Sequence, residues 1–121
     1  MKVCITTAGT EPEAKMDARF ARCRYFTFVD TESGAIEFVE NRFAGGANGV
    51  GTRVGQYLAE QGADVVITSQ VGPSAYAVLQ AAGIEAYSSN ASTIHEALAE
   101  YREGTLTRIT EPTGSKHAGR S

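Results

Sequence analysis

Cysteine, histidine and proline are scarce in this sequence and tryptophan is missing: its 121 residues include two cysteines, two histidines and three prolines. Two thiols are too few for the four-cysteine cage of an iron–sulfur protein. Cys4 and Cys23 also lack C-x-x-C spacing, and no secretory apolar segment precedes them, so we expect reduced thiols. No run approaches the roughly 20 apolar residues that span a bilayer. These absences favour a soluble cytoplasmic protein without a membrane segment.

Positive charge is also in short supply. Eleven Lys and Arg residues against 14 Asp and Glu residues give a formal net charge of −3, which argues against a broad nucleic-acid-binding surface. A hydrophobic share of 42% is ordinary for a globular domain, and a chain of this length needs no disulfide to fold. We therefore expect one domain over residues 1–106. Residues 107–121 carry no core-forming pattern, so we expect a flexible polar C-terminal tail there.

Five segments have the composition of β-strands. Residues 2–6 form a short, partly β-branched run, and two further runs joined by turn residues predict a hairpin. In this hairpin we expect Phe26, Phe28, Ile36 and Phe38 to share one face. A fourth, almost continuously apolar run is typical of a strand buried in a parallel sheet. The later strands are expected at residues 25–30, 35–40, 63–69 and 84–87.

Three segments have the apolar spacing of helices. Pro73 suits the first turn of the second helix, and Thr93 and Glu96 form a capping box at the start of the third. With right-handed crossovers, the order βββαβαβα predicts a mixed five-stranded sheet of order 3-2-1-4-5. We therefore expect an α/β protein with the ribonuclease-H-like fold. The predicted helices cover residues 48–61, 73–82 and 93–104.

A group of arginines forms an electropositive patch in this acidic chain. Arg19, Arg22 and Arg24 surround Cys23 and would lower the pKa of its thiol, which favours the metal-ligating thiolate. We therefore expect Cys23 to be exposed, with a pKa below the roughly 8.5 of a free thiol, and we treat it as a candidate metal ligand. The alternative is that the arginines are solvated or paired with acids such as Asp17, while Cys23 fills the core.

Two glycine-containing turns precede helices. The first, Asn48-Gly49-x-Gly51-Thr52, and the second, around Gly72, would offer backbone N–H groups and the positive end of a helix to an anion. The first turn lacks the lysine of a P-loop and the third glycine of a dinucleotide fingerprint. Gly51 serves either close packing or the close approach of a ligand. In this topology the two turns lie near each other, where ligands bind in open α/β sheets.

A catalytic constellation is not visible in the chain. Two-metal nucleases of the ribonuclease H type need a carboxylate on the first strand, and that strand has none. His95 and His117 have no partner at metal-ligand spacing and no cysteine nearby in the sequence. We therefore expect a binding protein rather than an enzyme.

Three motifs occur in the same chain: D-x-R-F-x-R-C-x-Y-F from Asp17, N-G-x-G from Asn48, and A-D-V-V-I-x-x-x-V-G-P from Ala63. Together they resemble the dinitrogenase iron–molybdenum cofactor biosynthesis family, with its NifX-like and NifB C-terminal-like domains. The resemblance covers residues 2–104. Asn48 stands where family members often have histidine, and Ala21 where a variant of the motif has glycine.

The resemblance implies a non-catalytic carrier or assembly protein related to nitrogen fixation. Its cargo would be an iron–molybdenum or other metal–sulfur cluster, transiently bound, and its partners the proteins that build or accept such clusters. Arginines and helix N-termini suit an anionic cluster. Two alternatives stay open: an enzyme or sensor for a small anion in the same cleft, and a regulatory domain that binds proteins. The predicted cofactor-binding residues are Arg19, Arg22, Cys23, Asn48, Gly49, Gly51, Thr52 and Gly72.

Overall fold

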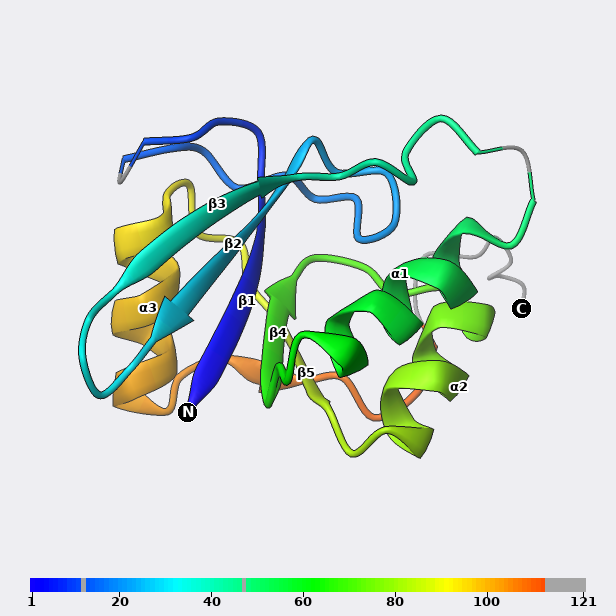
Figure 1. The fold of residues 1–121 in the computed structure, drawn as a ribbon. Helices are drawn as coiled ribbons and strands as arrows, with labels where there is room; N and C mark the ends of the chain where they lie inside the picture. Colours follow the sequence, from blue (N-terminus) through cyan, green and yellow to red (C-terminus); the bar gives the residue numbers. More distant parts are fainter. Residues whose placement is uncertain (12, 47, 113–121) are drawn as a thin grey trace.

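The computed structural model describes residues 1–11, 13–46 and 48–112 (Figure 1). None of the helices in these ranges is long and apolar enough to cross a membrane. Over the same ranges the chain forms one mixed sheet and three helices. The strands are β1 (Lys2–Thr7), β2 (Tyr25–Asp30), β3 (Ile36–Glu40), β4 (Val65–Thr68), β5 (Glu85–Ser88) and β6 (Thr107–Arg108). The helices are α1 (Val50–Glu60), α2 (Pro73–Ala81) and α3 (Ile94–Glu103).

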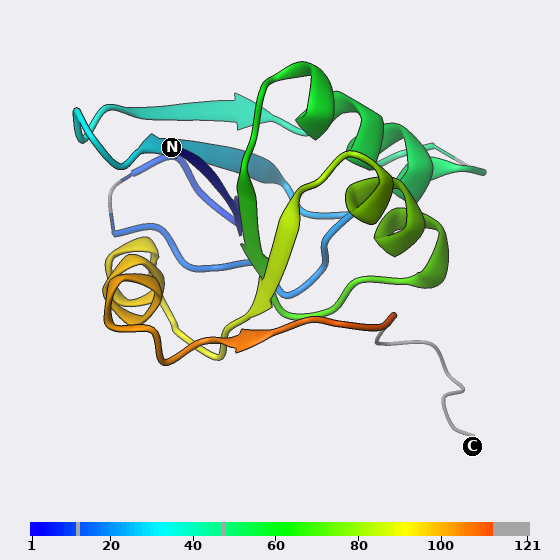
Figure 2. The same ribbon diagram turned by 90° about the horizontal axis from the view of Figure 1, so that it is seen from below.

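Strand β1 lies inside the sheet, between an antiparallel hairpin and the parallel strands. The strand order is β3-β2-β1-β4-β5-β6. β1 is antiparallel to β2 and parallel to β4, and β3 is antiparallel to β2. Helices α1 and α2 cover one face of the sheet and α3 covers the other (Figures 1 and 2). The segments that follow β1, β3 and β4 therefore all leave the sheet at the same edge.

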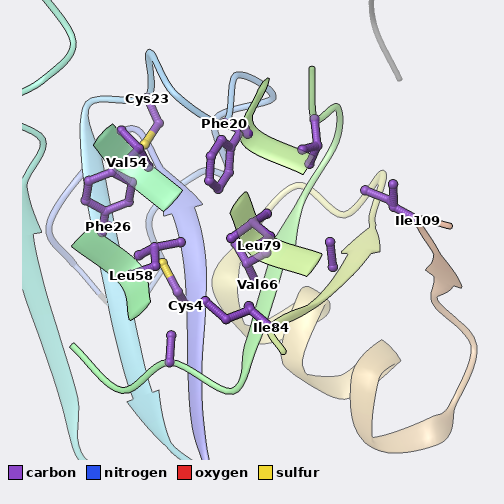
Figure 3. Packing of buried hydrophobic residues seen from close by; sticks show 14 of the residues in the cluster. Cys4, Phe20, Cys23, Phe26, Val54, Leu58, Val66, Leu79, Ile84 and Ile109 are labelled. Atoms are coloured by element: carbon purple, nitrogen blue, oxygen red, sulfur yellow. The ribbon is translucent and has the colours of Figure 1, made fainter. Parts of the chain in front are cut away.

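The core under α1 and α2 depends on close packing of these two helices. Fully buried side chains from the sheet and from α1 fill it (Figure 3). Two glycines of α1 face α2: a Cβ on Gly55 would lie 2.8 Å from Cγ1 of Val78, and one on Gly51 would lie 3.3 Å from Cβ of Ala75. Of the two roles considered for Gly51, close packing is therefore one that it has.

The α/β class, the three helices and the order of the five predicted strands are confirmed. The predicted number of strands is wrong, because β6 pairs antiparallel with β5 as a sixth strand. Just after β6, Ile109 N donates a hydrogen bond to the carbonyl of Ala86 at 2.8 Å, and the Ile109 side chain is buried. Residues 107–109 thus belong to the packed domain and not to the expected tail. Residues 113–121 of that tail lie outside the described residues.

The hairpin register also differs from the prediction. Phe26 and Phe28 pack in the cluster under α1 and α2, whereas Ile36 and Phe38 pack in the cluster on the side of α3. The backbone hydrogen bonds of the turn that begins at Asp30 fix this pairing. Since neighbouring residues of a strand point to opposite faces, a register shift of one residue exchanges the faces.

Candidate functional site

The loop between β1 and β2, at residues 8–24 and called the arginine loop below, is anchored at the carboxyl ends of β1 and β4. Asp17 N donates a hydrogen bond to the carbonyl of Thr6 at 2.8 Å. The Thr6 hydroxyl lies 2.6 Å from the carbonyl oxygen of Asp17 and 2.9 Å from the hydroxyl of Thr68. Farther along, Arg19 forms an isolated parallel bridge with Gln70, which follows β4. These contacts hold the loop over the ends of the two parallel strands.

Arg19 forms a two-point ion pair with Asp17. Its Nε donates to Oδ1 at 3.0 Å and its Nη2 donates to Oδ2 at 2.9 Å. Burial alone would raise the pKa of the Asp17 carboxyl, but hydrogen bonds from Arg19 and its charge lower that pKa below its usual value. Arg19 nevertheless stays largely exposed, with 61% of its side chain accessible. The alternative considered from the sequence, that an arginine pairs with Asp17, is therefore correct for Arg19.

Arg22 connects the arginine loop to the glycine-rich segment before α1. Its Nη1 donates hydrogen bonds to the carbonyls of Ala44 and Gly46, the second at 2.8 Å. Within the described residues, its Nε and Nη2 have no protein acceptor. Arg22 is thus held in place by one nitrogen and keeps donors for a ligand.

Helices α1 and α2 both begin without a side-chain cap. Gly49, with a φ of 69°, is the N-cap residue of α1, and Gly72 is that of α2; neither helix has an acidic residue in its first turn. Helix α3 differs, because the side chain of its N-cap residue Thr93 caps it: Thr93 Oγ1 accepts a hydrogen bond from Glu96 N at 3.3 Å. The backbone N–H groups in the first turns of α1 and α2 therefore keep their capacity to bind an anion.

The arginine loop, the start of α1 and the turn into α2 surround a cleft of about 320 Å³. Its lining contains two arginines and no carboxylate, whereas four other surface clefts in the described part of the chain each contain a carboxylate. In a chain with a net charge of −3, the lining of this cleft is therefore positively charged, although Asp17 behind it offsets part of the charge of Arg19. The polar and glycine residues that line it are Arg19, Arg22, Gly51, Gln70, Gly72 and Ser74.

Half of the residues predicted for the site line this cleft. Asn48, Gly49 and Thr52 lie at the same helix start but do not contribute to the lining. Gln70 and Ser74 also line the cleft; they belong to the predicted turn around Gly72 but were not among the predicted site residues. The predicted residues that do line the cleft are Arg19, Arg22, Gly51 and Gly72.

The predicted exposure of Cys23 is wrong. Its side chain is buried in the core under α1 (Figure 3). Burial, together with the charge of Asp17, raises the pKa of the Cys23 thiol to about 12. The adjacent Arg22 and Arg24 are exposed, so their charges do not offset the loss of solvent around the thiol. Cys23 therefore fills the core, and its role as a metal ligand stays a hypothesis that this burial disfavours.

Metal-ligand side chains are dispersed over the structure. In the described ranges, no three His, Cys, Asp or Glu side chains lie close enough together to hold a metal ion. Cys4 and Cys23 are free thiols, and both are buried. The groups that line the cleft offer hydrogen-bond donors and positive charge, which are the groups that attract anions in proteins.

A sequence profile of the family described as "Dinitrogenase iron-molybdenum cofactor" matches residues 1–104. The chain belongs to this family. The match includes the three helices and the strands β1 to β5, and it confirms the family indicated by the sequence motifs. It also includes every residue that lines the cleft.

Relatives of known sequence or structure match most of this chain and most of their own length. An uncharacterized protein of Methanocaldococcus jannaschii is 34% identical over 98 residues, which are 78% of this chain and 83% of that protein. The apo form of the orange protein of Desulfovibrio gigas superposes with a TM-score of 0.89 and 31% identity, over 93% of this chain and 96% of that one. A candidate NifB protein from Thermotoga superposes with a TM-score of 0.83 and 38% identity, over 94% of this chain and 97% of that one.

Proposed function

We propose that this protein is a non-catalytic carrier for an anionic metal–sulfur cluster of the iron–molybdenum type. Its partners would be proteins that build or accept such clusters in the cytoplasm. The observation that carries the proposal is that two arginines and two uncapped helix starts meet at one cleft without a carboxylate. Membership of an iron–molybdenum cofactor family supports this cargo. So does a relative solved in an apo form, the term for a binding protein without its ligand.

The cleft suits a cluster held by hydrogen bonds. Terminal sulfides of a thiometallate are negatively charged and accept hydrogen bonds from guanidinium and backbone N–H groups. Ala21, Pro73 and Ala75 add apolar wall, which fits weakly hydrated sulfur. Contacts of this kind can be exchanged one at a time, so a carrier can release its cargo to an acceptor. We take the α/β scaffold to be ribonuclease-H-like and to serve here for binding.

Titration of tetrathiomolybdate into the folded protein, followed by visible absorption, tests the proposal. Charge-assisted hydrogen bonds contribute about 1.5–3 kcal/mol each. The double variant Arg19→Ala with Arg22→Ala should therefore bind at least about tenfold more weakly than the unaltered protein. Raising the salt concentration should weaken binding to the unaltered protein, because screening reduces the attraction of exposed charges.

A matched control removes the same charge far from the cleft. Arg102→Ala with Arg108→Ala alters the end of α3 and β6, and should leave the affinity unchanged. Equal affinities of the two double variants would contradict the proposed location. Displacement of tetrathiomolybdate by an equal concentration of inorganic phosphate would favour the alternative, a site for a small oxyanion.

A further inference from the structure

Asp17 does not line the cleft, but it fixes the position of an arginine that does. The Asp17 side chain is only 8% exposed. Its two oxygens accept four hydrogen bonds: three from Arg19, through N at 3.0 Å, Nε at 3.0 Å and Nη2 at 2.9 Å, and one from Arg24 N at 3.3 Å. The carboxylate therefore holds both the backbone and the guanidinium group of Arg19.

This pairing leaves Arg19 with a defined set of donors. A guanidinium group has five N–H donors in a planar fork. Asp17 engages Nε and Nη2, and in the described part of the chain Nη1 has no acceptor. An unpaired guanidinium group at the end of a flexible side chain can move to contact anions of different sizes. Held by Asp17, Arg19 instead stands at a fixed distance from the start of α2, because its backbone also bridges to Gln70 just before that helix.

We propose that Asp17 is a specificity-determining residue that makes the cleft select an anion by its size and not by its charge alone. The inference rests on the proposed function. The negative charge of Asp17 offsets the positive charge of Arg19, so it lowers the affinity for all anions of equal charge to a similar extent. The fixed guanidinium group, in contrast, favours the anion whose size matches the gap between Arg19 and the first turn of α2.

Tetrathiomolybdate and molybdate test this role, because they share charge and tetrahedral shape but differ in size. We expect the unaltered protein to prefer tetrathiomolybdate, whose larger surface can reach both walls of the cleft. Asp17→Asn frees Arg19. It should reduce the ratio of the dissociation constant of molybdate to that of tetrathiomolybdate by about tenfold, the value of roughly one charge-assisted hydrogen bond. Arg19→Lys keeps the positive charge but cannot form the two-point pair, so it should reduce the ratio similarly.

Asp30→Asn is the matched control, since it makes the same change in net charge at the β2–β3 turn and should leave the ratio unchanged. Thermal unfolding of each variant reports whether it is folded. If Asp17→Asn does not fold, the ratio measured for Arg19→Lys tests the size selection. Weaker binding of both anions at an unchanged ratio would give Asp17 a purely structural role and overturn the inference. Absence of tetrathiomolybdate binding to the unaltered protein would instead contradict the proposed function.

Discussion

The side-chain amide of Asn41 closes over Cys23: its Nδ2 donates a hydrogen bond to the Cys23 carbonyl at 2.9 Å and lies 3.8 Å from Sγ. The same nitrogen donates to the carbonyl of Ala21 at 2.9 Å, and Oδ1 accepts from Phe43 N at 2.9 Å. Asn41 thereby joins the arginine loop to the segment that leads to α1, and its amide nitrogen contacts the thiol.

We predict that Cys23 does not react with thiol reagents in the folded protein. With a pKa of about 12, the thiol is almost entirely protonated near neutral pH, and the reactive form is the thiolate. Cys4→Ala leaves Cys23 as the single cysteine, so the rate with a disulfide reagent at pH 7, 8 and 9 measures it alone. We expect rapid reaction in urea and almost none without it. Rapid reaction of the folded protein, accelerating over this pH range, would show that the thiol is accessible.

Gly55→Ala should destabilise the protein in spite of alanine's better helix propensity. The new Cβ would lie 2.8 Å from Cγ1 of Val78, so α1 and α2 would have to separate. Overpacking of this kind costs about 1–3 kcal/mol, against a helix-propensity gain of up to about 1 kcal/mol. We expect a net loss in the free energy of unfolding measured in urea. Gly72→Ala is the control: its Cβ would meet no atom within 4 Å, and its φ of −72° suits alanine. A stabilised Gly55→Ala variant would contradict the packing account.

Ile109→Ala should lower the free energy of unfolding by about 2 kcal/mol or more, since it removes a buried side chain and leaves a cavity. Ile109 is 6% exposed and packs in the core under α1 and α2. Urea unfolding measures the change, and the exposed neighbour Thr110→Ala serves as control. If both variants unfolded at the same urea concentration as the unaltered protein, the segment after β6 would contribute nothing to the core.

The strands and helices with several apolar residues in a regular pattern could be predicted from the sequence. β4 is an almost continuous apolar run. At the predicted capping box of α3, Thr93 Oγ1 accepts from Glu96 N as expected, whereas the Glu96 carboxylate accepts from Ser92 N instead of Thr93 N. β6 could not be predicted, because a two-residue strand followed by a single buried isoleucine has no period to detect. The hairpin register depended on backbone hydrogen bonds in the turn after Asp30, which composition does not specify.

The candidate site could be predicted in part, for a similar reason. Arg19, Arg22 and Gly72 were identified from charge and glycine patterns, because those residue types are distinctive in an acidic chain. The burial of Cys23 was only the alternative to the predicted exposure, since sequence neighbours say nothing about which side chains the fold places over a thiol. Gln70 lies in the predicted turn around Gly72 but was not singled out, because an isolated glutamine carries no signal until its bridge to Arg19 is known.

In the proposed function, the cargo binds between the arginine loop and the starts of α1 and α2. Amide chemical shifts, recorded while tetrathiomolybdate is added to isotope-labelled protein, locate the bound anion. We predict the largest changes at the amides of Gly51, Ser74 and Ala75 and in the loop that carries Arg19 and Arg22, with α3 unaffected. Changes centred on α3, or spread evenly over the surface, would contradict the account.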